Sequence, residues 1–102
     1  MQNRILSLVG LAMKAGKVVS GEFSTEKAVK EGKASLVIVA EDASGNTKKL
    51  FLDKCDFYQV PVYIYGDKEQ IGHAIGKELR ASLAIVDTGF AKSIERELQK
   101  SI

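Results

Sequence analysis

The run from Leu36 to Ala40 constrains the fold of this chain more than any other feature, because its apolar residues are continuous rather than alternating. A strand of this kind is covered on both faces, as in a sheet between two layers of helices. Further strand candidates and helical patterns alternate with it. The strands are expected at 17–19, 60–65 and 83–86, and the helices at about 5–15, 20–31, 44–58, 67–75 and 87–98. This alternation predicts a three-layer α/β/α sandwich with a small four-stranded sheet, mostly parallel or mixed.

Short local patterns predict where some elements begin and how they pack. Ser44 is expected to cap the third helix, and the stretch 67–70 resembles a capping box. Pro61 places the first residues of its strand at the strand's start or at an edge of the sheet. Gly72 and Gly76, four residues apart on one helical face, are expected to allow close packing against a neighbouring segment.

The size and composition of the chain fit one ordinary folded domain, which we expect over residues 1–102. Hydrophobic residues make up 45% and charged residues 27%, so bulk disorder is excluded. The sequence has neither an apolar run of about 18 residues nor a secretory cleavage pattern. We therefore expect a cytoplasmic protein.

One cysteine and one histidine limit the chemistry of the chain. A single cysteine excludes an intrachain disulfide and a thiolate metal cluster, and we expect no metal or cofactor. Cys55 is expected to be an unreactive core residue, and His73 an exposed residue without a catalytic role. The expected buried face of the third helix consists of Thr47, Leu50, Phe51, Cys55 and Tyr58.

The positive charge is concentrated in the first third of the chain. Residues 1–33 hold six Lys and Arg against three Glu, whereas the remainder holds nine against ten acids, and the whole chain is +2. This asymmetry favours an anionic partner that docks on the first third. The alternative is a solvated surface whose asymmetry has no function.

The start of the second helix is a candidate anion site. Its first N–H groups have no partner within the helix, and Ser20 is expected to act as its capping residue. If the opposite side faces the core, then Phe23, Lys27 and Lys30 share one exposed face, where an aromatic ring can stack on a base and ammonium groups can meet phosphates. The alternative is that Phe23 packs under the preceding loop and that the lysines only solvate the helix.

Two further segments carry candidate binding residues. Glu41 and Asp42 follow a buried strand, where two acids can hold Mg²⁺ or accept hydrogen bonds from a base edge. The alternative is that Asp42 or the nearby serine caps the next helix. Leu79 and Arg80, in the connection before the last strand, could grip a flipped nucleotide, and a plain connector is the alternative.

Five stretches of the sequence, in this order, resemble the kink-turn RNA-binding ribosomal protein family (the seven-Ae and thirty-e proteins) and its bacterial YlxQ-like branch. They are Ala15–Glu22, Lys33–Ser44, Val60–Val62, Ile71–Lys77 and Asp87–Ala91. The resemblance covers about residues 5–96 and implies an α/β/α sandwich that binds RNA and is not an enzyme.

The resemblance also implies the position of the binding site. Gly21 and Lys27 match the family's pattern at the start of the second helix, and Leu79 matches an apolar residue placed against an extruded nucleotide. Phe23 and Ser24 stand where the family typically has asparagine and glutamate, a departure at the residues that read sheared G·A pairs. The candidate RNA-binding residues are Gly21, Glu22, Phe23, Ser24, Lys27, Lys30, Glu41, Leu79, Arg80 and Ala81.

The leading hypothesis is therefore a monomeric, non-enzymatic protein that binds structured RNA of the kink-turn kind and associates with the ribosome. In this hypothesis the amides at Gly21 and the Lys27 ammonium hold phosphates. Two alternatives stay open. One is a protein-interaction adaptor on the same fold, suggested by the exposed aromatic ring of Phe23. The other is a small enzyme that uses Glu41 and Asp42, which no nucleophile–base pair accompanies.

Overall fold

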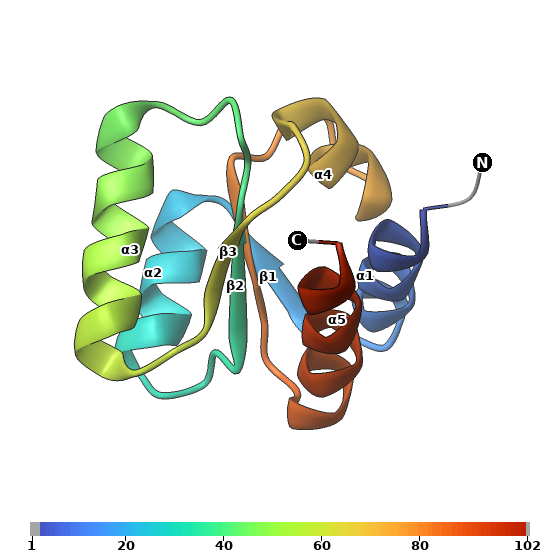
Figure 1. Cartoon of the computed structure of the whole chain (residues 1–102), viewed down its shortest axis with the longest axis horizontal. Coiled ribbons are helices and arrows are strands. Elements are labelled where there is room, and N and C mark those ends of the chain that lie inside the picture. Colours follow the sequence, from blue (N-terminus) through green and yellow to red (C-terminus); the bar gives the residue numbers. More distant parts are fainter. Residues whose placement is uncertain (1–2, 102) are drawn as a thin grey trace.

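The computed structural model describes residues 3–101 and contains a four-stranded sheet between helices (Figure 1). The elements in chain order are α1 (Arg4–Lys14), β1 (Val18–Ser20), α2 (Glu22–Lys30), β2 (Leu36–Val39), α3 (Gly45–Tyr58), β3 (Val62–Ile64), α4 (Lys68–Ala74), β4 (Ser82–Ile85) and α5 (Thr88–Lys100). Helices α2 and α3 pack together on one face of the sheet, and α1 and α5 pack together on the other. The predicted three-layer sandwich is thus confirmed.

The two central strands form the middle of the core. Every residue of β2 and β4 is buried, as expected of strands covered on both faces. The strand order is β1-β4-β2-β3, which leaves β3 at an edge, directly after Pro61. Both positions expected for this proline, the start of a strand and an edge, are therefore found.

The sheet is mixed, and the mostly parallel alternative is wrong. Strand β2 pairs with β3 in parallel, but β4 is antiparallel to both β1 and β2. The reason lies in the connection from β3 to β4. Helix α4 has seven residues, about 10 Å of length, and lies across one end of the sheet rather than along it (Figure 1). The chain therefore enters β4 from the end at which it left β3.

Two of the three expected helix caps are present. Ser44 accepts from the N–H of Thr47, and the capping box between Asp67 and Gln70 is complete. Ser20 does not cap α2, because Gly21 occupies the cap position and no side chain bonds to the free N–H groups. The hydroxyl of Ser20 is instead used by another segment, described below.

Cys55 is buried on α3, and burial raises the pKa of its thiol to about 11, which makes it a poor nucleophile. His73 is exposed, as expected. The placement of Tyr58 on the buried face is wrong. Its side chain is 40% exposed, because α3 ends there and the ring packs edge-on against Phe57. Within residues 3–101, no helix combines the length and apolar character needed to cross a membrane.

Candidate nucleic-acid interface

Candidate residues from three separate segments meet where the strands β1 and β2 end and β4 begins, the upper end of the sheet in Figure 1, while Lys27 and Lys30 lie further along α2. The end of β1 is joined to the start of β4 by the Gly21 N–H, which donates to the Ser82 carbonyl oxygen over 3.0 Å. The end of β2 is joined to the same connection by the Ala40 N–H, which donates to the Ala81 carbonyl oxygen over 2.8 Å. The starts of α2 and α3 and the connection before β4 therefore share one end of the molecule.

Gly21 shapes the start of α2 but has no free amide to offer. Its φ of 88° lies in the region that favours glycine, and this conformation turns the chain from β1 into the helix. Because its N–H is already bonded to Ser82, the expected phosphate contact from this amide is wrong. The open donors are the next three N–H groups, of Glu22, Phe23 and Ser24, which have no partner among residues 3–101. These N–H groups form the positive end of the helix dipole, where an anion is stabilised.

The exposed face of α2 carries the expected aromatic and basic side chains. Phe23 is 79% exposed, so the alternative in which it packs under the preceding loop is wrong. Lys27 is exposed and has no ion pair among the residues that the structure describes. Lys30 is less available, because its ammonium lies 3.2 Å from the Glu26 carboxylate. A shallow hollow of about 220 Å³ follows this face and is lined by Phe23, Glu26, Lys27, Lys30 and Glu31.

Arg80 connects the loop before β4 to the start of α2. Its Nε donates to the Ser20 hydroxyl over 3.2 Å, and its Nη1 donates to the Leu79 carbonyl oxygen over 2.8 Å. These contacts hold the guanidinium at Ser20, two residues before the first open amide, while the Leu79 side chain remains 58% exposed. The combination of Phe23, Ser24, Lys27, Leu79 and Arg80 is called the α2 surface below.

The position of this loop depends on Gly72. A β-carbon at this buried glycine would lie 1.8 Å from the Glu78 carbonyl oxygen and 3.2 Å from the Cα of Leu79. The close packing expected at Gly72 is therefore confirmed. The segment that packs against Gly72 is the loop before β4, which carries Leu79 and Arg80. The same expectation for Gly76 is wrong, because α4 ends at Ala74 and Gly76 lies in the following turn with a φ of 74°.

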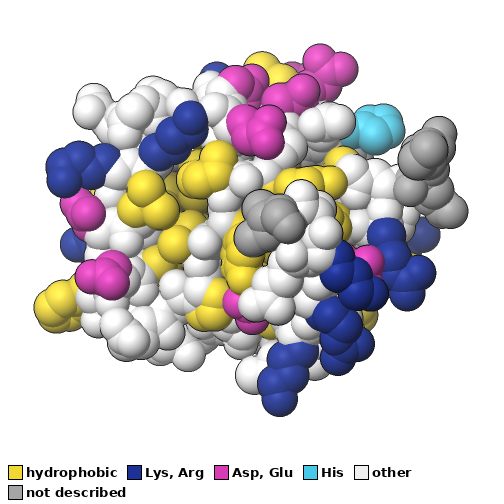
Figure 2. Space-filling model, in the orientation of Figure 1, with side chains coloured by type: hydrophobic (Ala, Val, Ile, Leu, Met, Phe, Trp, Pro, Cys, Tyr) yellow, Lys and Arg dark blue, Asp and Glu magenta, His cyan; other side chains and the backbone are white. Residues whose placement is uncertain are grey.

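The acidic candidates border the α2 surface. Glu22 is held by α3, since its carboxylate accepts from the Thr47 hydroxyl over 3.2 Å. Glu41 is exposed, whereas Asp42 accepts from the N–H of Lys68 at the start of α4 over 2.9 Å. Acidic side chains gather on the upper edge over α4 (Figure 2). These acidic side chains repel phosphates. The exposed carboxylate of Glu41 can instead accept hydrogen bonds from a base edge.

The remaining candidate, Ala81, contributes through its backbone alone, as the acceptor for Ala40. The described part of the chain holds no group of three His, Cys, Asp or Glu residues that could bind a metal ion. Asp42 has one carboxylate oxygen engaged by a backbone amide, which reduces what the Glu41–Asp42 pair could offer to Mg²⁺.

Two sets of residues escaped the sequence analysis. Ser20 gives no signal as an anchor for Arg80, because the two residues are 60 positions apart. The second set, Lys92, Arg96 and Lys100 on α5, has a readable signal, since a spacing of four places them on one helical face. A comparison of net charge between segments does not reveal these three residues, because acidic residues in the same third of the sequence cancel their positive charge.

Comparisons with known proteins point to one family. The model of the Ribosomal protein L7Ae/L30e/S12e/Gadd45 family matches residues 3–95. A Bacillus subtilis (strain 168) protein named RNA-binding protein YlxQ is 45% identical over 87 residues, which cover 85% of this chain and 87% of that protein. An Enterococcus faecium protein of the same name is 41% identical over 98 residues, or 96% of this chain and 94% of that one.

Solved structures agree on the fold. A protein of unknown function from Bacillus halodurans C superposes with a TM-score of 0.93 at 40% identity, covering 96% of this chain and 99% of that chain. The Giardia lamblia 15.5kD RNA binding protein superposes with a TM-score of 0.83 at 22% identity, covering 100% of this chain and 93% of that chain. The second likeness concerns the fold alone. With a family match across most of its length and two relatives above 40% identity, the chain belongs to the Ribosomal protein L7Ae/L30e/S12e/Gadd45 family.

Proposed function

We propose that this chain is a cytoplasmic, non-enzymatic RNA-binding domain that acts as a monomer and binds structured RNA of the kink-turn kind, including RNA of the ribosome. One observation carries the proposal. Exposed Phe23 and Lys27 (unpaired within the described residues) share the start of α2 with three open amides, and the bond from Arg80 to Ser20 ties the loop of exposed Leu79 to this helix start. The names of the two curated relatives support RNA as the ligand.

Each part of the α2 surface has a role that follows from its chemistry. The three open amides and the Lys27 ammonium bind phosphates. The Ser24 hydroxyl donates to or accepts from a base edge, and the Phe23 ring stacks on a base. Leu79 packs against an extruded nucleotide, with the Arg80 guanidinium beside it.

The departure at Phe23 and Ser24 defines what kind of recognition to expect. A phenyl ring and a hydroxyl have fewer hydrogen-bonding groups than an amide and a carboxylate. The proposed site therefore relies on phosphate binding and stacking more than on base-edge hydrogen bonds. Such binding depends strongly on salt, because each phosphate contact releases counterions.

Neither alternative is favoured. The adaptor hypothesis rests on the exposed Phe23 ring, which serves stacking equally well and lies beside a cation rather than in an apolar patch. For the enzyme hypothesis, the relationship to RNA-binding relatives supports a binding protein. The engagement of Asp42 by a backbone amide further weakens it.

The test is the substitution Lys27→Ala, measured by titrating the protein into a fluorescently labelled kink-turn duplex at several salt concentrations. Loss of one phosphate contact is expected to weaken binding roughly three- to tenfold and to reduce the salt slope by about one. The control is Lys33→Ala, an exposed lysine paired with Glu31 beyond the far end of α2, which should bind as the wild type does. An unchanged isotherm for Lys27→Ala across about 50–200 mM salt would contradict the proposal.

A further inference from the structure

A row of basic side chains runs along α5, on the opposite side of the sheet from the α2 surface. Lys92, Arg96 and Lys100, called the α5 basic row, are spaced four apart and exposed. They lie opposite the buried side of α5, which consists of Ala91, Ile94 and Leu98. Figure 2 shows basic side chains gathered in the region that α1 and α5 occupy in Figure 1.

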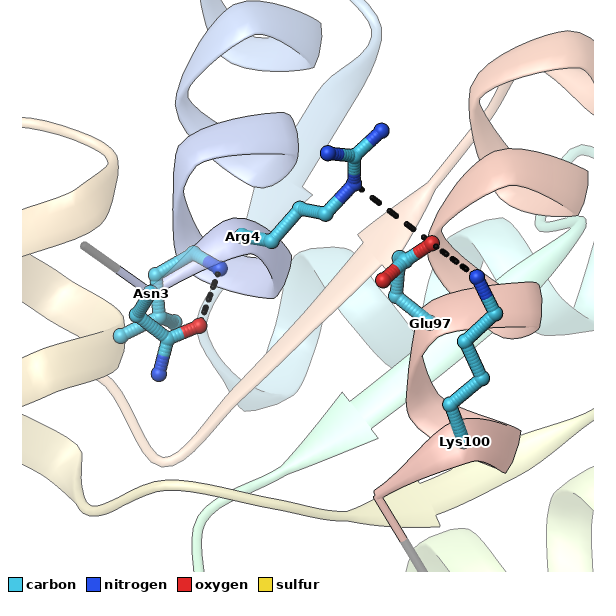
Figure 3. A network of polar contacts seen from close by, with 5 residues as sticks. Asn3, Arg4, Glu97 and Lys100 are labelled. Carbon is cyan, nitrogen blue, oxygen red and sulfur yellow. Dashed lines mark hydrogen bonds and ion pairs between the residues drawn. The ribbon is translucent and has the colours of Figure 1, made fainter. Parts of the chain in front are cut away.

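The row continues onto the start of α1 through a shared carboxylate. Glu97, whose side chain is 16% exposed, lies 3.5 Å from the Arg4 Nε and 3.3 Å from the Lys100 ammonium. Figure 3 shows the two terminal guanidinium nitrogens of Arg4 pointing away from Glu97. One acid thus fixes two cations without using all their donors.

Lys92 and Arg96 carry their charges without compensation, since neither has an ion pair among residues 3–101. The other acid of this helix, Glu95, is turned toward the sheet, where it accepts from the Tyr63 hydroxyl over 2.9 Å. Four cations against one carboxylate make this the more strongly basic of the two surfaces. The α2 surface, by contrast, has two cations, Lys27 and Arg80, and Glu26 engages the neighbouring Lys30.

The composition of the row favours nucleic acid over protein as its partner. A protein interface usually has aromatic or large apolar side chains at its centre. The exposed large apolar residues of the described chain are Leu11, Phe23, Leu52, Phe57, Tyr58, Ile64 and Leu79, and none of them lies on α5. Row members rise about 6 Å from one to the next, so the row offers cations over a length of about 12 Å, along which one strand of a duplex, at about 3.4 Å per phosphate, presents several phosphates.

We propose that the α5 basic row binds the phosphates of a second RNA segment without reading its sequence, so that one protein joins two RNA segments. The geometry requires two segments, because the row and the α2 surface lie on opposite layers of a molecule 26–35 Å across. The row has no exposed aromatic ring for stacking, so it contributes phosphate contacts alone. The bridging role rests on the proposed function of the α2 surface, whereas phosphate binding by the row does not.

The test uses a plain RNA duplex, without a kink-turn, immobilised on a biosensor surface. The double variant Lys92→Gln/Arg96→Gln is compared with Lys33→Gln/Lys49→Gln, which loses the same charge from exposed ion pairs elsewhere. The row variant should bind the duplex roughly tenfold more weakly, with a salt slope reduced by about two, while the control binds like the wild type. Equal losses in both variants would overturn the proposal, because net charge alone would then explain binding.

A second step tests the bridge. A labelled kink-turn duplex is passed over wild-type protein already retained on the plain duplex, and its capture is expected. Lys27→Ala should stay on the plain duplex but capture less kink-turn RNA. Displacement of the protein by kink-turn RNA would overturn the proposal by showing one shared surface. Binding to a polyglutamate peptide but not to the plain duplex would overturn it in favour of an acidic protein partner.

If kink-turn RNA fails to bind while the plain duplex still depends on the row, the proposed function of the α2 surface has failed. The proposal that the row binds phosphates then remains supported, and the proposal that the protein joins two RNA segments is rejected. The reverse pattern, with kink-turn binding intact and no effect of the row variant on the duplex, overturns the row and leaves the proposed function.

Discussion

The α2 surface and the α5 basic row present cations in two different ways. The α2 surface is assembled from segments far apart in sequence, through the bond between Ser20 and Arg80 and the contact of Gly72 with the loop before β4. The row belongs to one helix and needs only a repeat of four residues. An assembled surface has a shape that a folded RNA can match, whereas a single row offers charge along a line. The comparison teaches that the α2 surface depends on tertiary contacts for its shape, whereas the α5 basic row depends only on helix geometry.

The substitution Gly72→Ala is expected to distinguish most clearly between binding at the α2 surface and binding at the α5 basic row. The added β-carbon would collide with the backbone of Glu78, so the loop must move away from α4. We expect a loss of about 1–3 kcal/mol in unfolding free energy and a Tm lower by roughly 5–20 °C. Kink-turn binding, measured well below that Tm, should fall at least about tenfold, while plain-duplex binding by the α5 basic row should not change.

The matched control for this variant is Gly45→Ala. Gly45 lies in the first turn of α3, and a β-carbon there meets nothing within 4 Å. It should leave the Tm unchanged or slightly higher, because alanine favours the helix. If Gly72→Ala lowers both kinds of binding equally, the two surfaces are not independent.

A smaller effect is expected from Ser20→Ala, which removes the acceptor for the Arg80 Nε. The guanidinium and the adjoining leucine should become less well positioned, so kink-turn binding should weaken roughly two- to fivefold, the effect of about one modest hydrogen bond. Ser7→Ala, an exposed change on α1, is the control. Both variants are measured by the same fluorescence titration, and wild-type affinity for Ser20→Ala would show that Arg80 needs no anchor.

The smallest expected effect comes from Glu97→Gln. Removing the carboxylate shared by Arg4 and Lys100 adds one net positive charge to the row. Plain-duplex binding should tighten about two- to threefold with a steeper salt slope, and kink-turn binding should stay the same. Glu69→Gln, an exposed change on α4, should not reproduce the gain. A loss of duplex binding would instead mean that Glu97 is needed to position the two cations.

The layers of the fold could be predicted because burial leaves a periodic trace in the sequence. The unbroken apolar run of β2 and the helical spacing of apolar residues in α1 and α5 point directly to a covered sheet. The direction of β4 leaves no such trace, since a buried strand has the same pattern in either direction. The direction of β4 follows from the shortness of α4, which returns the chain to the end of the sheet where β3 ended. Apolar periodicity does not reveal this.

The candidate site was predictable in part. The exposed face of Phe23 and Lys27 follows from helical geometry, but the use of the Gly21 amide depends on which strand lies beside β1. The pairing of Lys30 with Glu26 was readable from their spacing of four residues. The anchor of Arg80 was not readable, because it joins segments that meet only after the sheet has formed.

The reversal of β4 determines where the chain can change in length without disturbing the sheet. Because the chain leaves β3 and enters β4 at the same end, the whole connection 65–81 begins and finishes at the end of the sheet that carries the proposed α2 surface. Insertions or deletions in this connection are expected to reshape that end of the sheet without changing the register of the strands. Changes to the proposed binding surface are thereby separated from changes to the sheet, and segment 75–81 is the natural place to introduce new specificity.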